Sequence, residues 1–380
     1  MTVLHVANWY PTPWDDVAGN FVRDHIRLFR AEIAGDAVVV EVRHDPNAWL
    51  TFQRLDLGDG VGGYFLLTCL KAGKVTEWLT AVMMLAVLLV QRAWRFDALH
   101  IHIAYPLAVH ARLWRWLIRG PVLISEHWSA YHDNFYLPEN SSALGLLRRP
   151  FAFGYPVLAV SETLLGDIRK FAQRSDFQGY VIPNFVPLHG STPKQNATPI
   201  LFAVNIWREI KDPFPMLKGL ASAAEGGADF RLVLGGFGEL LGEMKEFVGG
   251  SALADRTVFP GKMTKAEIKQ ALAEADASLF SSRYETFSVA CAEALGAGVP
   301  LIGPHLDAVA EYAGPDDWVC VESRDAVGWS DAVARFVARH AAGEFDSVTI
   351  AARAAARFSP ESIRARYRDV MAQHLPGGLL

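Results

Sequence analysis

The stretch ASLFSSRYETFSVACAEALGAGVPLIGP, from Ala277 to Pro304, constrains the fold more than any other part of the sequence. It contains two short apolar runs, separated by a polar turn and an amphipathic segment. This order predicts a strand, a turn, a helix and a second strand of a parallel sheet. Glu285 lies where the turn becomes the helix, and Glu293 lies inside the helix. We expect the first helical turn to be formed by Thr286, Phe287 and Ser288.

The predicted start of this helix is a candidate phosphate site, because the first N–H groups of a helix have no partner within it. If the helix begins at Glu285, then Glu293 lies on the order of 12 Å further along its axis, at 1.5 Å per residue. That distance suits the two ends of a nucleotide-sugar. It is too long for a retaining hydrolase, whose two carboxyl groups lie about 5 Å apart.

The chain has 380 residues, which predicts two domains. A polar, proline-containing stretch at 187–199 is the expected linker. It follows a domain at 1–186 and precedes a domain at 200–359 and a closing helical segment at 360–380. Apolar runs alternate with helical patterns in both halves. We therefore expect an α/β protein with two doubly wound, Rossmann-like domains.

Charge, cysteine content and the N-terminal residues limit the classes of protein to which the chain can belong. The net charge of −5 gives no general signal for nucleic acid binding, so any anion must be bound locally. Three widely spaced cysteines suit a reducing compartment, and Cys291 is expected to be a packed thiol. The N-terminus reads as a first strand rather than as a signal peptide.

Two glycine-bearing segments in the first half are candidate ligand loops. Gly19 precedes a predicted helix that starts near Phe21, where it either lets the backbone approach a ligand or simply starts the helix. The segment GDGVGG at Gly58–Gly63 satisfies G-x-G-x-x-G, but an apolar run follows it and no strand is predicted before it. It is interpreted as a hairpin-like turn.

Two segments raise the question of membrane contact. The apolar segment from Trp78 to Val90 is shorter than the roughly 20 residues of a membrane span, so we expect a core helix. The segment ARLWRWLIRG after it is expected to form a helix with Arg112, Arg115 and Arg119 at helical spacing. This helix either rests on an anionic membrane or presents an ordinary solvated face.

Histidines follow two predicted strands of the first half. His100 and His102 share one face of a strand, as metal ligands or as a polar edge of the sheet. His127 follows the strand VLISE at the carboxyl end, where open α/β sheets bind ligands. A histidine at this place can donate a hydrogen bond or exchange a proton near neutral pH.

In the second half, basic residues and glycines follow the first two predicted strands. Arg208 and Lys211 come after the strand PILFAVN and could neutralise a pyrophosphate, unless they are ordinary surface residues. Gly236 lies in the next loop, where the backbone could approach a ligand.

The motif YETFSVACAEALGAGVP resembles the E-x7-E signature of the retaining family-4 glycosyltransferases, which have the GT-B fold of two Rossmann-like domains facing a cleft. The order of the shorter motifs WYP, EHWS, VSE, IPN and FPGKMT is also similar to that family. The resemblance implies transfer of a sugar from a nucleoside diphosphate-sugar, a UDP-sugar or GDP-sugar, to an acceptor hydroxyl. It implies no metal and no other cofactor.

The resemblance also implies roles for individual residues. Glu293 would hold the ribose hydroxyls and Glu285 the donor sugar, while Lys211 would neutralise the pyrophosphate. His127 would face the sugar and the acceptor, and Gly19 would lie near the phosphate. The chain departs from the family at two places: Ile206 stands where an arginine is usual, and Ser288 stands where a glycine is frequent.

The resemblance predicts a hexosyl- or N-acetylhexosaminyl-transferase of polysaccharide or glycolipid synthesis, acting on a glycan or lipid-linked acceptor. We expect it in the cytoplasm, and its contact with the inner face of the membrane is a further hypothesis. Two alternatives stay open: a nucleotide-sugar epimerase, or phosphorylase, of the same architecture, and a non-catalytic sugar-binding protein.

Overall fold

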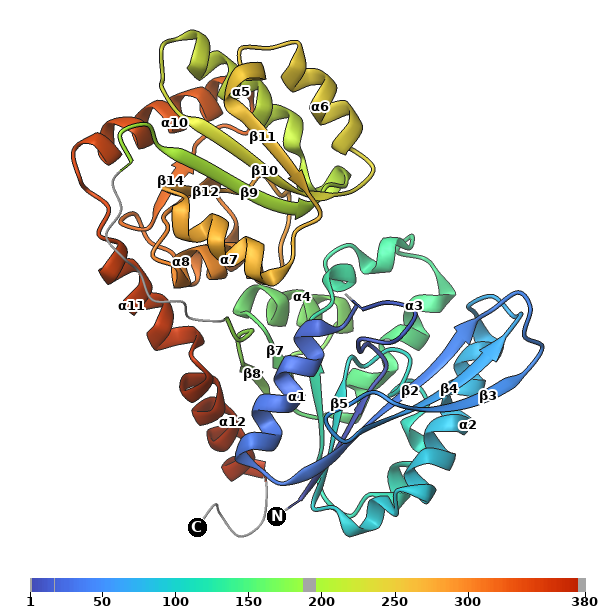
Figure 1. Cartoon of the computed structure of the whole chain (residues 1–380). Helices are drawn as coiled ribbons and strands as arrows, with labels where there is room; N and C mark the ends of the chain where they lie inside the picture. Colours follow the sequence, from blue (N-terminus) through green and yellow to red (C-terminus); the bar gives the residue numbers. More distant parts are fainter. Residues whose placement is uncertain (1, 17, 187–195, 375–380) are drawn as a thin grey trace. The chain divides into compact units, whose positions relative to one another are not determined.

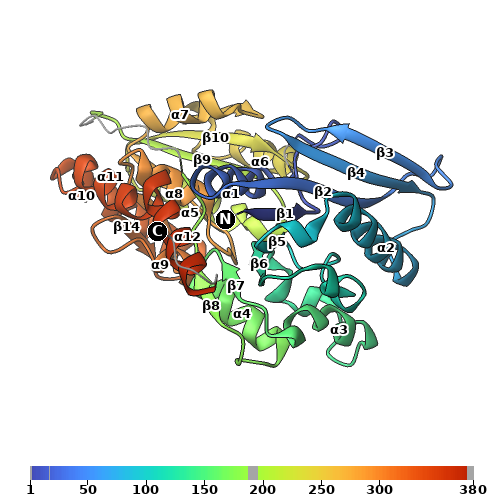
Figure 2. The same cartoon turned by 90° about the horizontal axis from the view of Figure 1, so that it is seen from below.

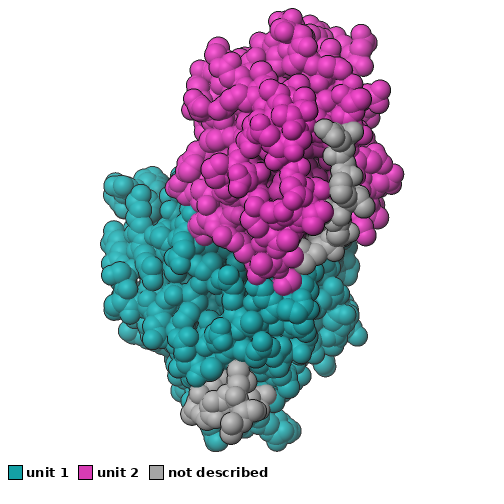
Figure 3. Space-filling view, turned by 90° about the vertical axis from the view of Figure 1, so that its left-hand side faces the viewer, with its two compact units in different colours: residues 1–185, 360–380 teal, residues 186–359 magenta. Residues whose placement is uncertain are grey.

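A computed structural model describes residues 2–16, 18–186 and 196–374 (Figure 1). These residues form two compact units, coloured in Figure 3: unit 1 is Met1–Phe185 with Pro360–Leu380, and unit 2 is Val186–Ser359. Of the expected linker at 187–199, residues 187–195 lie outside the described residues, as do 375–380 of the closing segment. Each unit is built on its own sheet.

Unit 1 contains an eight-stranded sheet in the order β3-β4-β2-β1-β5-β6-β7-β8. Its neighbouring strands are parallel except for the antiparallel pair β3 and β4. The strands are β1 (Val3–Ala7), β2 (Gly35–His44), β3 (Thr51–Asp56), β4 (Val61–Thr68), β5 (Ala98–His102), β6 (Val122–Glu126), β7 (Val157–Ala159) and β8 (Gly179–Val181). The α-helices are α1 (Asn20–Glu32), α2 (Lys74–Val90), α3 (Ser142–Leu147), α4 (Glu162–Ala172) and α12 (Pro360–His374).

Helices cover both faces of this sheet, because its strands are apolar on both sides. On one face, Val3 of β1 and Ala98 of β5 share a core with Phe29 of α1 and Tyr367 of α12. Helices α1 and α12 lie side by side there, although they come from opposite ends of the chain (Figure 1). On the other face, α2 packs against β2 (Figure 2).

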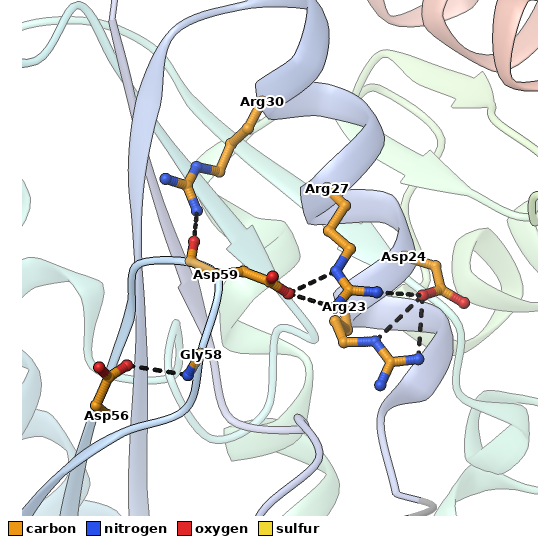
Figure 4. Close-up of polar contacts among 7 residues, drawn as sticks. All are labelled: Arg23, Asp24, Arg27, Arg30, Asp56, Gly58 and Asp59. Carbon is orange, nitrogen blue, oxygen red and sulfur yellow. Dashed lines mark hydrogen bonds and ion pairs between the residues drawn. The ribbon is translucent and has the colours of Figure 1, made fainter.

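The first half of GDGVGG, residues 58–60, lies in the turn between β3 and β4, as the sequence predicts, and residues 61–63 begin β4. The prediction that no strand precedes it is wrong: β3 does, but TFQRLD has no long apolar run because β3 is exposed along much of its length. The turn is fastened to α1. The Arg27 Nε–H donates to Asp59 Oδ2 at 2.6 Å, and an Arg30 guanidinium N–H donates to the Asp59 carbonyl at 2.8 Å (Figure 4).

The predicted helix at Arg112–Arg119 is wrong. The segment forms two short 3-10 turns, η2 (Ala111–Leu113) and η3 (Arg115–Leu117), between which the chain leaves helical geometry at Trp114. The indole of Trp114 is fully buried, and the Arg115 guanidinium donates to the carbonyls of Ile118 and Gly120. The arginines therefore do not form one helical face.

Unit 2 contains a six-stranded parallel sheet in the order β11-β10-β9-β12-β13-β14. The strands are β9 (Ile200–Ile206), β10 (Arg231–Phe237), β11 (Thr257–Gly261), β12 (Ala277–Leu279), β13 (Leu301–Pro304) and β14 (Trp318–Val321). The helices are α5 (Pro213–Glu225), α6 (Leu241–Gly249), α7 (Lys265–Glu274), α8 (Val289–Gly296), α9 (Asp307–Ala310), α10 (Ala326–Ala341) and α11 (Ser347–Phe358). The strand–helix–strand order predicted for Ala277–Pro304 is confirmed by β12, α8 and β13.

Candidate functional site

Lys211 and Glu285 form an ion pair at the carboxyl ends of the neighbouring strands β9 and β12. Lys211 Nζ lies 2.5 Å from Glu285 Oε1, and the Ser282 hydroxyl donates to the same oxygen at 2.7 Å. The two side chains are 21% and 18% exposed, so a ligand can still reach them. This end of a parallel sheet is where open α/β folds bind their ligands.

The loops that carry this pair are tied to each other. The Ser281 hydroxyl donates to the Lys211 carbonyl at 2.5 Å, and the Arg283 backbone N–H donates to the Ile210 carbonyl at 2.9 Å. Arg283 also forms a 3.1 Å ion pair with Asp212. Sequence reasoning missed Ser281 and Ser282, and two hydroxyls directly after a buried strand were the available signal.

Arg208 lies three residues before Lys211, beyond the end of β9. Its side chain is exposed and makes no hydrogen bond or ion pair within the described ranges. The preceding Trp207 is buried, and its indole N–H donates to the Gly235 carbonyl at 2.9 Å. A guanidinium without a protein partner at a sheet end is available to an anion.

Helix α8 begins later than predicted. It starts at Val289, so Thr286, Phe287 and Ser288 precede it and do not form its first turn. The reason is local: Ser288 has φ 65° and ψ 83°, which is left-handed backbone and ends the extended loop. The estimate of 12 Å between Glu285 and Glu293 therefore does not hold, because only the part from Val289 onward is helical.

The loop before α8 is held by Tyr312, a residue that sequence reasoning missed. Its hydroxyl donates to the carbonyls of Phe287 and Ser288, at 2.8 and 3.1 Å. The Phe287 ring is buried and packs on Tyr312 and Phe358. Only the backbone of Phe287, and not its side chain, is therefore available to contact a bound ligand.

Helix α8 carries a buried thiol and a half-buried carboxylate near its start. Cys291 is buried, and burial raises the pKa of its thiol to about 12, so it is a packed thiol as predicted. Glu293, two residues further on, is half-buried. Glu293 and Lys211 belong to the same unit. Glu293 lies within α8, and Lys211 contacts the β12–α8 loop through Glu285.

Glycines at the two predicted ligand loops contact backbone. A Cβ on Gly236, which has φ 108°, would lie 1.9 Å from the Asn205 carbonyl oxygen at the end of β9. A Cβ on Gly19, which has φ 70° and caps α1, would lie 2.5 Å from the backbone of Trp9 and Tyr10. Both glycines are therefore required by packing, and their predicted contact with a donor stays a prediction.

His127 follows β6 in unit 1 and is buried. Its ring contacts the rings of Phe21 and His25, with 4.8 Å between centroids in each case. Burial lowers the pKa of His127 well below 6.5, and the neighbouring His25 lowers it further. The imidazole is thus neutral at pH 7, and of the two predicted roles this favours a hydrogen bond over proton exchange.

Glu126, next to His127, closes the end of β6. Its Oε1 accepts the Ala104 backbone N–H at 2.7 Å and the Tyr131 hydroxyl at 2.6 Å. Burial raises the pKa of this carboxyl to about 7. Glu126 therefore fastens the loops after β5 and β6 to each other.

A buried polar network lies behind His127, and sequence reasoning missed most of it. His100 Nε2 lies 2.7 Å from Ser125 Oγ. The Tyr367 hydroxyl lies 2.5 Å from His25 Nδ1, and His25 Nε2 lies 3.1 Å from Asn184 Oδ1. Because an amide oxygen only accepts, Nε2 of neutral His25 is the donor and Nδ1 accepts the tyrosine hydroxyl. Tyr367 of α12 thereby fixes the tautomer of a histidine that contacts His127.

One of the two interpretations placed His100 and His102 at a polar edge of the sheet, and this interpretation is wrong. β5 lies between β1 and β6, and both histidines are fully buried together with His5 of β1. One ligand atom from each of the three lies within 4.8 Å of the others, so the cluster could hold a metal ion. His5 Nδ1 lies 3.1 Å from His102 Nε2, the distance of an ordinary hydrogen bond.

Comparison with known proteins gives one family and several structures. Residues 198–339 match the family model "Glycosyl transferases group 1". An N-acetyl-alpha-D-glucosaminyl L-malate synthase of Bacillus anthracis is 25% identical over 249 residues. That match covers 62% of this chain and 64% of the relative.

The solved structures cover nearly the whole chain. A sucrose-phosphate synthase from Thermosynechococcus elongatus has a TM-score of 0.73 at 17% identity, covering 98% of this chain and 99% of that one. Anabaena HepE, in complex with UDP, has a TM-score of 0.73 at 14% identity, covering 98% and 100%. The chain therefore has the two-domain GT-B fold, and its residues 198–339 carry a match to the glycosyl transferases group 1.

Proposed function

We propose that this protein is a retaining glycosyltransferase that moves a sugar from a nucleoside diphosphate-sugar to an acceptor hydroxyl. The observation that carries the proposal is the half-buried Lys211–Glu285 pair, held by Ser282 at the carboxyl ends of β9 and β12. It combines a cation for a diphosphate with a carboxylate for sugar hydroxyls. The pair also lies inside the residues that match the glycosyltransferase family.

The leaving group sets the chemistry of this reaction. As the bond to the sugar breaks, negative charge grows on the diphosphate, and fixed positive charge stabilises it. Lys211 and the exposed Arg208 supply that charge, and the N–H groups from Val289 onward add the field of the α8 N-terminus. We assign Glu285 to the hydroxyls of the sugar and Glu293 to those of the ribose.

His127 is assigned to the sugar and the acceptor, as a neutral hydrogen-bonding group. The acceptor attacks on the face from which the diphosphate departs, and an oxygen of the departing group takes the acceptor proton. No protein side chain then has to form a covalent bond to the sugar. The reaction as proposed uses no metal.

UDP-sugars are the first donors to test. HepE structures contain UDP, UDP with glucose, and UDP-glucose, while the Bacillus anthracis relative is named for an N-acetylglucosaminyl product. Another structural neighbour is a lipopolysaccharide outer core galactosyltransferase, which favours polysaccharide or glycolipid synthesis. We therefore propose a hexosyl- or N-acetylhexosaminyl-transferase with a glycan or lipid-linked acceptor.

The test begins with donor binding. Thermal unfolding is measured with UDP, UDP-glucose, UDP-N-acetylglucosamine and GDP-mannose, and a specific donor at 100 times its dissociation constant should add about 3 kcal/mol of stability. The best donor is then used for turnover with an acceptor panel. Lys211→Met and Glu285→Gln should each lower turnover by about 100-fold or more, since each removes a charge that acts on the donor.

Matched controls come from the same unit. Lys218→Met on α5 and Glu274→Gln on α7 remove the same charges from exposed side chains that are not part of the pair, and turnover should stay at the wild-type level. Near wild-type turnover in Lys211→Met or Glu285→Gln would show that the site assignment is wrong. A changed sugar without added acceptor would instead identify an epimerase, and donor binding with neither transfer nor hydrolysis would identify a binding protein.

A further inference from the structure

Helix α2 in unit 1 has an apolar outer face. Its inner side is buried through residues such as Met84 and Leu88, but the outer side is also apolar. The exposed apolar side chains are Val75, Trp78, Val82, Leu89 and Val90, with exposed fractions of 60, 52, 55, 43 and 66%. From Trp78 to Val90 the helix has no charged residue. The prediction of a core helix was thus right for one side only.

Further exposed apolar residues flank both ends of α2. Leu70 precedes the helix, and Trp94 lies in η1 (Ala93–Arg95) after it. Trp49 is 86% exposed, and its carbonyl accepts the Thr68 hydroxyl at 3.1 Å, so it lies near the strand end that leads into α2. We call α2 with these flanking residues the α2 face; helix α2 is seen in Figure 2.

The 3-10 turns η2 and η3 extend the α2 face sideways. Trp78 stacks on His110, with 4.4 Å between ring centroids, and α2 packs against η2. Trp116 of η3 is 71% exposed, with its indole N–H bound to the Leu113 carbonyl at 2.8 Å. Exposed tryptophans therefore lie on the helix, beside it and near its ends. Tryptophan is enriched at membrane–water interfaces, because its ring is apolar and its N–H is polar.

The charges around the α2 face are mostly positive. Residues 69–97 and 105–120 contain seven basic residues and two acidic residues, Glu77 and Asp97, in a chain of net charge −5. Asp97 accepts the Thr2 backbone N–H at 2.8 Å. Glu77 is half-buried and accepts the Tyr105 hydroxyl at 3.0 Å. Six of the basic residues are exposed and make no side-chain hydrogen bond or ion pair with the described residues: Lys71, Lys74, Arg92, Arg95, Arg112 and Arg119.

We propose that the α2 face docks unit 1 onto an anionic lipid surface, with α2 lying in the plane of the interface. An apolar helix about 25 Å long, at 1.5 Å per residue, can sink its outer side chains to the level of the acyl chains. The basic residues at its rim then meet the phosphates of anionic headgroups. Within the described ranges, no helix is long and apolar enough to cross a membrane.

Charge distinguishes the lipid surface from the other possible occupant, a second copy of this chain. Two copies that met through this face would bring two sets of unpaired cations together, and like charges repel. A lipid surface satisfies both the apolar helix and the cations. The buried apolar area and the attraction of the cations to anionic lipids add to each other in such binding.

The test is co-sedimentation of the full chain with vesicles of phosphatidylcholine containing 30% phosphatidylglycerol. The wild type should bind the anionic vesicles at low salt and bind them less at 0.5 M salt. It should bind pure phosphatidylcholine vesicles only weakly. The double variant Val82→Gln/Leu89→Gln should bind at least tenfold more weakly. Arg92→Gln should weaken binding about fivefold, since each basic residue near the surface contributes about 1 kcal/mol.

Controls use equally exposed residues of unit 2. Val258 and Val327 are 59 and 69% exposed, so the double variant Val258→Gln/Val327→Gln removes similar apolar surface and should bind like the wild type. Lys269→Gln is the matching control for charge. Thermal unfolding of each variant checks that it is folded. Quenching by brominated lipid supplies a second readout, and it should fall in Trp78→Phe and in Trp116→Phe.

Two results would overturn the proposal. The first is wild-type protein that does not bind the anionic vesicles at low salt, or α2 variants that bind as well as the controls. The second is a stable dimer in light scattering that Val82→Gln/Leu89→Gln converts to a monomer, without any vesicle binding by the wild type. That result would assign the α2 face to a second copy.

Discussion

Mild acid should unfold unit 1 before unit 2, because unit 1 buries five histidines. These are His5, His25, His100, His102 and His127. Burial is the largest cause of a lowered pKa in each, to about 4 for His25 and about 3 for His100. The described part of unit 2 has no fully buried histidine.

The folded and unfolded states bind different numbers of protons, and this difference decides how stability changes with pH. Below pH 6.5 the unfolded chain protonates these histidines and the folded chain does not, so stability falls as the pH falls. Glu126 acts in the opposite direction, because its raised pKa of about 7 lets the folded state bind a proton that the unfolded state lacks. At pH 5.5 the five histidines take up about 4.5 protons on unfolding and Glu126 gives back about 0.9.

The net uptake of about 3.6 protons corresponds to a slope of about 5 kcal/mol per pH unit. Integrated from pH 6.5 to pH 5, the loss is about 6 kcal/mol, which is comparable to the whole stability of a typical domain. Hydrogen exchange followed by mass spectrometry, at low urea and pH 7, 6, 5.5 and 5, reports each unit separately. Peptides from unit 1 should lose protection first.

A variant separates this cause from general acid sensitivity. His100→Gln keeps an N–H donor for Ser125 but removes one titrating group, so the slope should fall by about 1 kcal/mol per pH unit. His44→Gln changes an exposed histidine of the same unit and should leave the slope unchanged. The reasoning is refuted if unit 1 loses about 1 kcal/mol per pH unit or less, or if unit 2 loses stability as steeply.

Three further predictions concern stability measured by urea unfolding. Gly236→Ala should destabilise unit 2 by about 2 kcal/mol or more, because its Cβ would clash with the Asn205 carbonyl in left-handed backbone; wild-type stability would contradict the packing described. Ser288→Gly should match the wild type or exceed it by up to about 1 kcal/mol, while Ser288→Ala should not, because only glycine relieves a φ of 65°. Tyr367→Phe should cost about 1–3 kcal/mol by leaving His25 Nδ1 without its donor, whereas Tyr180→Phe removes a hydroxyl bonded at the surface and should cost little; equal losses would argue against the buried network.

Periodic patterns predicted most of the fold. In unit 2 the apolar runs and helical patterns alternate regularly, so strands such as Ile200–Ile206 and helices such as Ala326–Ala341 could be located from local sequence. Patterns failed where distant contacts decide the structure. The Arg112–Arg119 segment has helical spacing, but burial of Trp114 and the carbonyl bonds of Arg115 favour two short turns.

The candidate site was only partly accessible to sequence reasoning. Lys211 and Glu285 lie 74 positions apart, and their pairing depends on β9 and β12 being neighbours in the sheet. The start of α8 depends on one backbone angle at Ser288, which no hydrophobic pattern records. His25 and Tyr367 come from the two ends of the chain, so only the packing of α1 on α12 reveals that they meet.

Ile206 stands where an arginine is usual in the resembled family, so another guanidinium near the Lys211–Glu285 pair would have to meet a diphosphate. Arg324 donates to the carbonyls of Ser282 and His305, so it holds the β12–α8 loop in place. Arg283 is paired with Asp212, beside Lys211. In the described parts of the chain, Arg208 has no such partner and is exposed. Its guanidinium can therefore turn toward an anion without breaking a contact, and we expect Arg208 to take the role that the family resemblance gives to an arginine at the position of Ile206.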